Sequence, residues 1–162
     1  MDRRIPEIIE NMPRSVKGAY VIEFFLQSPI FLTVGKLGKF RLEPGWCYYI
    51  GSARNGLRGR LIRHITGKGR LWWHIDYLRR KIAPARFWYV VTDERLESSI
   101  VKIVESKAAP AIAGFGAGDS TDDSSHLFFS ERRVNYKKQL KKLGPVKMVV
   151  IRGKTSGQDV IK

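Results

Sequence analysis

The sequence predicts a small α+β domain in which a mostly antiparallel central sheet is flanked by helices. Apolar, β-branched and aromatic residues form short runs near the N-terminus, which predict strands. A last apolar run, residues 146–151, predicts a further strand. Between them, apolar residues recur at helical spacing. The 162 residues fit one domain, because domains commonly contain about 100 to 150 residues.

The first third of the chain is predicted to consist of strands. Residues 18–26 and 29–34 are rich in β-forming side chains, and the short connection QSP between them indicates a hairpin. Two further strands are expected over residues 39–42 and 46–51, each preceded by a glycine. These segments predict a small antiparallel sheet.

Helices are expected beyond Gly56. Residues 57–65 place Leu and Ile on one face, with arginines between them, and the sequence TGKGR ends this helix. Residues 92–108 are predicted to form the most regular helix, capped by Thr92 or Asp93. The remaining elements are expected as a helix over 71–82 before Pro84, a strand over 85–91, a glycine- and acid-rich loop over 114–125, a strand over 126–129 and a basic helix over 131–144.

The charge balance predicts a polyanionic partner. Thirty Lys and Arg against fifteen Asp and Glu give a net charge of +15, which exceeds what solubility requires of a small domain. The positive charges are interleaved with aromatic residues that can stack on bases, so nucleic acid is the expected partner, although charge alone recognises the DNA and RNA backbones alike. A basic surface without a partner is the alternative.

Membrane and secreted classes are not indicated. No stretch approaches the ~20 apolar residues of a spanning helix, and the N-terminus lacks the apolar core of a secretion signal. The single cysteine, Cys47, provides neither a disulfide framework nor a thiolate zinc site. We therefore expect a cytoplasmic protein with no membrane partner.

Two tyrosines and two arginines suggest a phosphodiester site. Tyr20 lies in GAY and Tyr49 in YIG, on strands that would direct both phenols to one pocket if they pair. The helix after Gly56 would then bring Arg60 and Arg63 to that pocket, with guanidinium groups suited to phosphate oxygens. Ordinary aromatic packing beside a solvated basic face is equally compatible. Alternation along the strand should place Tyr48 on the opposite sheet face.

These motifs resemble those of the GIY-YIG endonuclease superfamily. GAY at 18–20 resembles the first motif, with Ala19 in place of the usual middle aliphatic residue, and YIG at 49–51 matches the second. The segment GLRGRL resembles the arginine-bearing helix, and Glu97 in LESSIV the metal-binding glutamate. The segments VGKLGKF, YYIGSA, WWHIDYL, GFGAGDS and SHLFF are similar to an uncharacterised, largely archaeal branch that is sometimes fused to endonuclease III.

The resemblance implies a metal-dependent endonuclease that acts on DNA with low intrinsic sequence preference. Tyr49 would act as general base on the attacking water or position it, in a field supplied by arginines and metal, while Tyr20 helps to order that water. Arg60 would bind the scissile phosphate, and Glu97 would hold Mg²⁺ or Mn²⁺. His126 stands where the family carries a late asparagine.

The resemblance also divides the chain and adds binding residues. The expected parts are an N-terminal extension (1–16), a nuclease domain (17–130) and a basic helix and strand (131–162) packed on the same domain. Residues 119, 122 and 123 are expected to form a solvated acidic loop rather than a cation site. Further substrate-binding residues are expected to be Ser52, Arg58, Arg63, His64, His74, Lys137 and Lys138.

Several of these assignments have structural alternatives. Glu97 alone reads equally as a surface residue, and His74 as a histidine satisfied among aromatic rings. The lysines of 131–144 extend a phosphate-binding surface or are merely solvated on a helix docked by Val134, Leu140 and Leu143. For the whole protein, the alternatives are a non-catalytic nucleic-acid-binding module and an RNA-processing protein. A targeting partner is expected, because no separate reading module is evident.

Overall fold

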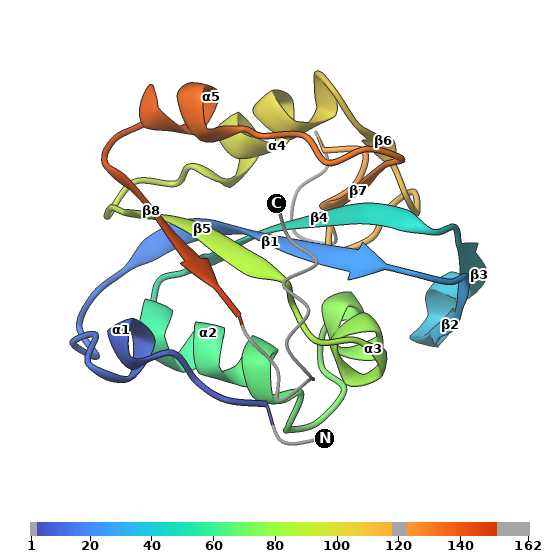
Figure 1. Ribbon diagram of the computed structural model, residues 1–162, viewed down its shortest axis with the longest axis horizontal. Coiled ribbons are helices and arrows are strands. Elements are labelled where there is room, and N and C mark those ends of the chain that lie inside the picture. The colour runs from blue at the N-terminus through green and yellow to red at the C-terminus, as the bar shows by residue number, and fades with distance from the viewer. Residues whose placement is uncertain (1–2, 118–122, 152–162) are drawn as a thin grey trace.

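The computed structural model describes residues 3–117 and 123–151. Its centre is a six-stranded sheet with the order β6-β7-β4-β1-β5-β8, in which neighbouring strands are antiparallel and helices cover both faces (Figure 1). The predicted α+β class is confirmed. The strands of this sheet are β1 (Gly18–Leu26), β4 (Gly45–Ala53), β5 (Arg86–Val91), β6 (Ala109–Pro110), β7 (Leu127–Ser130) and β8 (Val146–Val150).

Two hydrophobic cores lie on opposite faces of the sheet. One core packs beneath α1 (Glu7–Glu10), α2 (Leu57–Thr66) and α3 (His74–Lys81), and the other beneath α4 (Glu97–Glu105) and α5 (Lys137–Lys141) (Figure 1). Alternation along β1 feeds both cores, because Ile22 and Phe24 enter the first while Ala19 and Val21 enter the second. In β4, Tyr49 likewise belongs to the first core and Tyr48 to the second, as expected.

The predicted hairpin between residues 18–26 and 29–34 is wrong. β2 (Ile30–Val34) pairs with β3 (Gly38–Leu42) across a short 3₁₀ turn, η1 (Gly35–Leu37), whereas β1 pairs with β4 and β5. Burial explains the difference. β1 is buried on both faces and takes a central position, but β2 exposes Phe31 and Thr33 on one face, so it lies in a separate ribbon at one end of the sheet (Figure 1).

Three predicted helices are shorter in the structure, and the one expected over 71–82 begins only at His74. The helix expected over 92–108 begins only at Glu97, because the Thr92 hydroxyl accepts the N–H of Glu94 in the preceding turn instead of capping the helix. The basic helix expected over 131–144 is reduced to α5. Residues before it bond to the second core, where the N–H of Val134 donates to the Tyr48 hydroxyl. The predicted docking of this segment through Val134, Leu140 and Leu143 is confirmed.

The end of β4 determines where a cleft can form. β7 pairs only with residues 46–49 of β4, so the last residues of β4 extend beyond its neighbour. Gly56, with φ of +124°, then turns the chain into α2. Within residues 3–117 and 123–151, no helix has the length and apolar character needed to span a membrane.

Candidate active-site cleft

A cleft of about 480 Å³ opens beside the protruding end of β4. Its walls come from both helical layers, because α2 contributes from one side of the sheet and the start of α4 from the other. Five residues expected from the sequence line it together: Tyr49, Ser52, Arg60, Glu97 and His126. The other lining residues are Trp73, Arg95, Ser98 and Gly116.

Tyr20 lies beneath the cleft rather than in its lining. Its hydroxyl is 2.9 Å from Nε2 of His64, and both side chains are buried. Gly51 lies directly opposite Tyr20 in the sheet, and a Cβ at Gly51 would lie 2.5 Å from the Tyr20 hydroxyl and its ring carbon. The glycine of YIG is therefore required because the Tyr20 ring crosses it. Burial raises the pKa of Tyr20 to about 12, although the charge of Arg60 opposes the shift.

Tyr49 reaches the cleft but keeps its proton. Burial raises the pKa of the Tyr49 phenol well above its usual value, and the nearby Tyr20 and the carboxylate of Glu97 add to the shift. The positive charge of Arg60 lowers this pKa but does not outweigh burial. The expected field was that of arginines and a metal ion together, and Arg60 acts in the expected direction, though less strongly than burial acts against it.

Two of the three arginines of α2, Arg60 and Arg63, are held in different ways. The guanidinium carbons of Arg60 and Arg63 lie 4.3 and 4.6 Å from the centroid of the Trp73 ring, within cation–π range. Arg63 also donates from two nitrogens to the carboxylate of Asp76. Within the described residues, no carboxylate forms an ion pair with Arg60. No described carboxylate therefore neutralises Arg60, although its hydrogen bond to the Tyr20 side chain acts to lower the pKa of that phenol.

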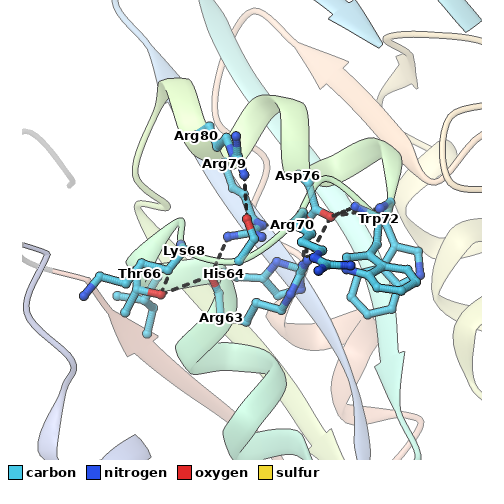
Figure 2. A network of polar contacts seen from close by, with 12 residues as sticks. Arg63, His64, Thr66, Lys68, Arg70, Trp72, Asp76, Arg79 and Arg80 are labelled. Atoms are coloured by element: carbon cyan, nitrogen blue, oxygen red, sulfur yellow. Dashed lines mark hydrogen bonds and ion pairs between the residues drawn. The ribbon is translucent and has the colours of Figure 1, made fainter. Parts of the chain in front are cut away.

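Asp76 organises the polar network behind the cleft wall (Figure 2). Its Oδ2 accepts the backbone N–H groups of Trp72 and Trp73 at 2.7 and 2.8 Å, and its Oδ1 accepts Nε of Arg79 at 2.6 Å. Burial alone would raise the pKa of Asp76. The hydrogen bonds from Arg63 and from these donors outweigh burial and hold the pKa well below its usual range.

The wall opposite Arg60 is joined through Asp123. Its Oδ2 accepts the hydroxyl of Ser98 at 3.0 Å and lies 3.0 Å from Nε2 of His126, so it connects α4 to the start of β7. Gly116 backs this wall with φ of +68°. A Cβ there would lie 3.2 Å from Cβ of His126 and 3.3 Å from the Tyr49 ring, so a larger residue would crowd both.

The remaining predicted binding residues surround the cleft without lining it. His74 accepts the N–H of Gly116 through Nδ1 at 2.9 Å, and burial lowers its pKa. Burial, followed by the charge of Arg60, lowers the pKa of His64 to about 3, so this ring is neutral. Nε of Arg58 donates to the carbonyl of Glu10 at 3.0 Å.

Lys137 and Lys138 are exposed on α5, away from the cleft lining. α5 is anchored at the far end of α4, where the Tyr136 hydroxyl donates to the carbonyl of Val104. Val104 is seven residues from Glu97 along α4, which is about 10 Å at 1.5 Å per residue. Of the expected acidic loop, residues 119 and 122 lie outside the described residues, and Asp123 is bonded as described above.

Among the described residues that line the cleft, Glu97 is the only acidic side chain. Across the described ranges, no three His, Cys, Asp or Glu side chains group as ligands of one metal ion. This donor set fits Mg²⁺ bound by one carboxylate, because Mg²⁺ usually keeps several waters and takes its other ligands from substrate phosphates. It does not fit a metal enclosed by protein ligands alone.

Four lining residues were not expected from the sequence. Trp73 and Gly116 fall in the segments WWHIDYL and GFGAGDS, and Arg95 and Ser98 flank Glu97. The adjacent tryptophans were the available signal, because a Trp pair outside any apolar stripe indicates an exposed aromatic surface. Asp76 was missed because its partner Arg63 lies on another helix.

Comparisons with known proteins identify a family without assigning an activity. No curated protein and no solved structure matches the chain. One family model matches residues 19–148, which include most of β1, all the strands that border the cleft and most of β8. This match covers well over half of the chain, which therefore belongs to the family described as domain of unknown function DUF123.

Proposed function

We propose that this protein is a metal-dependent endonuclease that hydrolyses phosphodiester bonds in DNA with low intrinsic sequence preference. The supporting observation is that Tyr49, Arg60 and Glu97, which come from three separate parts of the chain, line one cleft. The proposal also rests on the resemblance of these motifs to the GIY-YIG endonuclease superfamily. The net charge of +15 supports a polyanionic substrate.

Arg60 is the residue best suited to bind the scissile phosphate. Its guanidinium lies against Trp73, which fixes its direction, and it forms no ion pair with any described carboxylate. A planar guanidinium can donate two parallel hydrogen bonds to phosphate oxygens. In the transition state the phosphate gains negative charge, so Arg60 would stabilise it more than the ground state. Arg95, in the same lining, adds a second positive charge.

Glu97 would hold Mg²⁺ or Mn²⁺ together with a phosphate oxygen and water. When bound, the ion supplies Lewis-acid stabilisation of the leaving oxygen. Without the ion, Glu97 is the only negative charge among the described side chains that line the cleft, and it faces an arginine-rich site. This arrangement allows a phosphate to enter without strong repulsion.

Tyr49 would act on the attacking water. Because its pKa is raised, its hydroxyl carries a proton at neutral pH and holds water by a hydrogen bond. To act as a general base it must first lose that proton, which requires more positive charge than the arginines supply. Tyr20 acts as a positioning residue, because its hydroxyl bonds to His64 behind the cleft. His126 and Ser52 would contact the nucleotide from the remaining walls.

Cleavage of a panel of branched, nicked, single-stranded and duplex DNA in Mg²⁺ or Mn²⁺ tests this proposal. Tyr49→Phe and Glu97→Gln should each lower the cleavage rate by about 100-fold or more. Tyr89→Phe on β5 and Glu105→Gln at the far end of α4 are matched controls outside the cleft lining, and they should retain the wild-type rate. Cleavage that survives both cleft substitutions would exclude this site.

A non-catalytic nucleic-acid-binding module is the second candidate. It is favoured by the raised pKa of Tyr49, by the presence of one carboxylate among the described residues that line the cleft, and by histidine at position 126 where the resembling family has asparagine. Binding without cleavage of any substrate in the panel would establish it. Competition between DNA and RNA at one fixed salt concentration tests the RNA-processing alternative, because phosphate contacts alone recognise both backbones.

A further inference from the structure

An exposed aromatic surface adjoins the cleft. Trp72 is 70% exposed, and its neighbours Leu71 and Trp73 are each 42% exposed. Exposed apolar groups that cluster in this way usually mark a binding surface. Trp73 lines the cleft and lies against Arg60 and Arg63, whereas Trp72 makes no ring or cation contact within the described residues. The Trp72 ring therefore has an uncovered face.

The backbone that carries this ring is fixed. Asp76 accepts the N–H of Trp72 at 2.7 Å and that of Trp73 at 2.8 Å, and the same carboxylate is held by Arg63 and Arg79 (Figure 2). Asp76 is fully buried, so water does not compete for these bonds. A ring on a fixed backbone loses less conformational entropy when a ligand binds.

The charge around the ring favours a polyanion. Between Leu57 and Lys81 the sequence carries eight Lys or Arg side chains and one acidic residue, Asp76. Asp76 is buried and already paired, so the accessible charge of this segment is positive. A flat aromatic ring in a cationic surface is the combination that binds single-stranded nucleic acid, because bases stack on the ring while the backbone follows the positive charge.

We propose that Trp72 is a stacking site for an unpaired base next to the phosphate held in the cleft, so that the preferred substrate is DNA with a single-stranded segment at the cleavage position. This inference rests on the proposed function. Trp72 is the direct chain neighbour of Trp73, which lines the cleft. A strand whose phosphate lies beside Trp73 can therefore place a neighbouring base over Trp72.

Binding to two ligands of equal charge tests the stacking site. The probes are a short oligothymidylate and an abasic phosphodiester of the same length, titrated at one salt concentration by fluorescence anisotropy. The wild-type protein should bind the oligothymidylate about tenfold more tightly, since stacking of one base contributes about 1–3 kcal/mol. Trp72→Ala should bring the two affinities close together, and Trp72→Phe should restore most of the difference.

Phe31→Ala is the matched control, because Phe31 is an exposed aromatic residue outside the cleft lining. It should leave the affinity ratio unchanged. Equal binding of the two probes by wild type, or an unchanged ratio in Trp72→Ala, would overturn the stacking site. Tighter binding of an oligouridylate than of the oligothymidylate would overturn the choice of DNA.

A second readout separates this inference from the proposed function. The intrinsic fluorescence of Trp72 should be quenched by the oligothymidylate, and Trp72→Phe should remove that quenching. Glu97→Gln should abolish cleavage but keep the wild-type affinity ratio. An active enzyme that binds both probes equally would refute the stacking site alone, whereas an inactive protein with a high ratio would refute the proposed cleavage alone.

Discussion

Two buried carboxylates, one on each side of the sheet, have similar partners and opposite properties. Asp76 forms ion pairs with Arg63 and Arg79 in the layer of α2 and α3. Glu23 on β1 forms ion pairs with Arg86 and Arg133 on the side of the second core. The pKa of Asp76 is held well below its usual range, whereas burial raises the pKa of Glu23 despite its two arginines.

Stronger desolvation of Glu23 and better hydrogen bonding of Asp76 together explain the difference. Asp76 accepts two backbone N–H groups and two donors from one guanidinium, in addition to Arg79. Glu23 accepts the indole N–H of Trp88 at 3.0 Å, and its arginine contacts are longer, at 3.1 and 3.2 Å. The extent of desolvation and the number and quality of donors, rather than the number of arginines, thus decide whether a buried carboxylate stays an anion. The fixed anion is the one beside the cleft.

The sharpest test of this comparison is the loss of each charge. Asp76→Asn should lower the free energy of unfolding by about 3–5 kcal/mol, because it leaves the buried Arg79 and the partly buried Arg63 without their partner. Glu23→Gln should change it by less than about 1 kcal/mol at neutral pH, because the raised pKa of Glu23 shows that the folded chain favours the neutral form of this carboxyl. Urea denaturation at neutral pH measures both. Equal losses would show that the two sites do not differ.

The pH dependence of stability should have opposite signs at the two sites. The pKa of Asp76 is lower in the folded chain, so its contribution is present above about pH 4 and is lost as the pH falls. The pKa of Glu23 is higher in the folded chain, so its contribution is present at acidic pH and is lost as the pH rises above about 4.3.

Chemical denaturation at a series of pH values tests this difference. The stability advantage of wild type over Asp76→Asn should shrink toward acidic pH, and its advantage over Glu23→Gln should shrink toward neutral pH. Parallel curves for the two variants would contradict the assigned directions.

Conservative changes of one arginine at each site should separate function from structure. Lysine in place of Arg63 cannot bond Asp76 through two parallel donors or stack as a plane on Trp73. Arg63→Lys should therefore weaken binding of single-stranded DNA about fivefold, a change of about 1 kcal/mol. Arg133→Lys should change this affinity less than about twofold. A larger loss of affinity in Arg133→Lys than in Arg63→Lys would indicate that DNA binds on the side of the sheet that carries Arg133.

The smallest effect is expected on α5, on the side of Glu23. Replacing Lys137 and Lys138 together by alanine should make the salt dependence of DNA affinity shallower by about 2 in log–log slope if both contact phosphates as predicted. The cleavage rate at saturating DNA should not change, because neither residue lines the cleft. An unchanged slope would assign both lysines to solvent.

The sequence predicted the fold class because alternation and helical spacing report burial directly. It did not predict the partner of β1, since a short turn signal at residues 27–29 cannot reveal that β1 is buried on both faces and β2 on only one. The length of the helix before Gly144 was predicted wrongly for a related reason. Bonds from Val134 and Tyr136 to the second core, rather than helical propensity, determine the conformation of this segment.

The order of the motifs along the sequence predicted part of the candidate site. Tyr49, Arg60 and Glu97 were named from their motifs, and they line the same cleft. The depth of Tyr20 and the exposure of Trp72 were not accessible, because both depend on how distant segments pack. The raised pKa of Tyr49 was missed for the same reason, since spacing in a sequence shows nearby charges but not desolvation.

The contact between Gly51 and Tyr20 makes these two positions interdependent. Ring carbons of Tyr20, as well as its hydroxyl, lie within 2.8 Å of where a methyl group on residue 51 would stand. Trimming the hydroxyl alone, as in Tyr20→Phe, would therefore not make room for alanine at 51. Accommodating alanine at position 51 would require a small residue at position 20, which would remove the bond to His64. The absence of a side chain on the neighbouring strand is therefore what leaves room for the Tyr20 phenol.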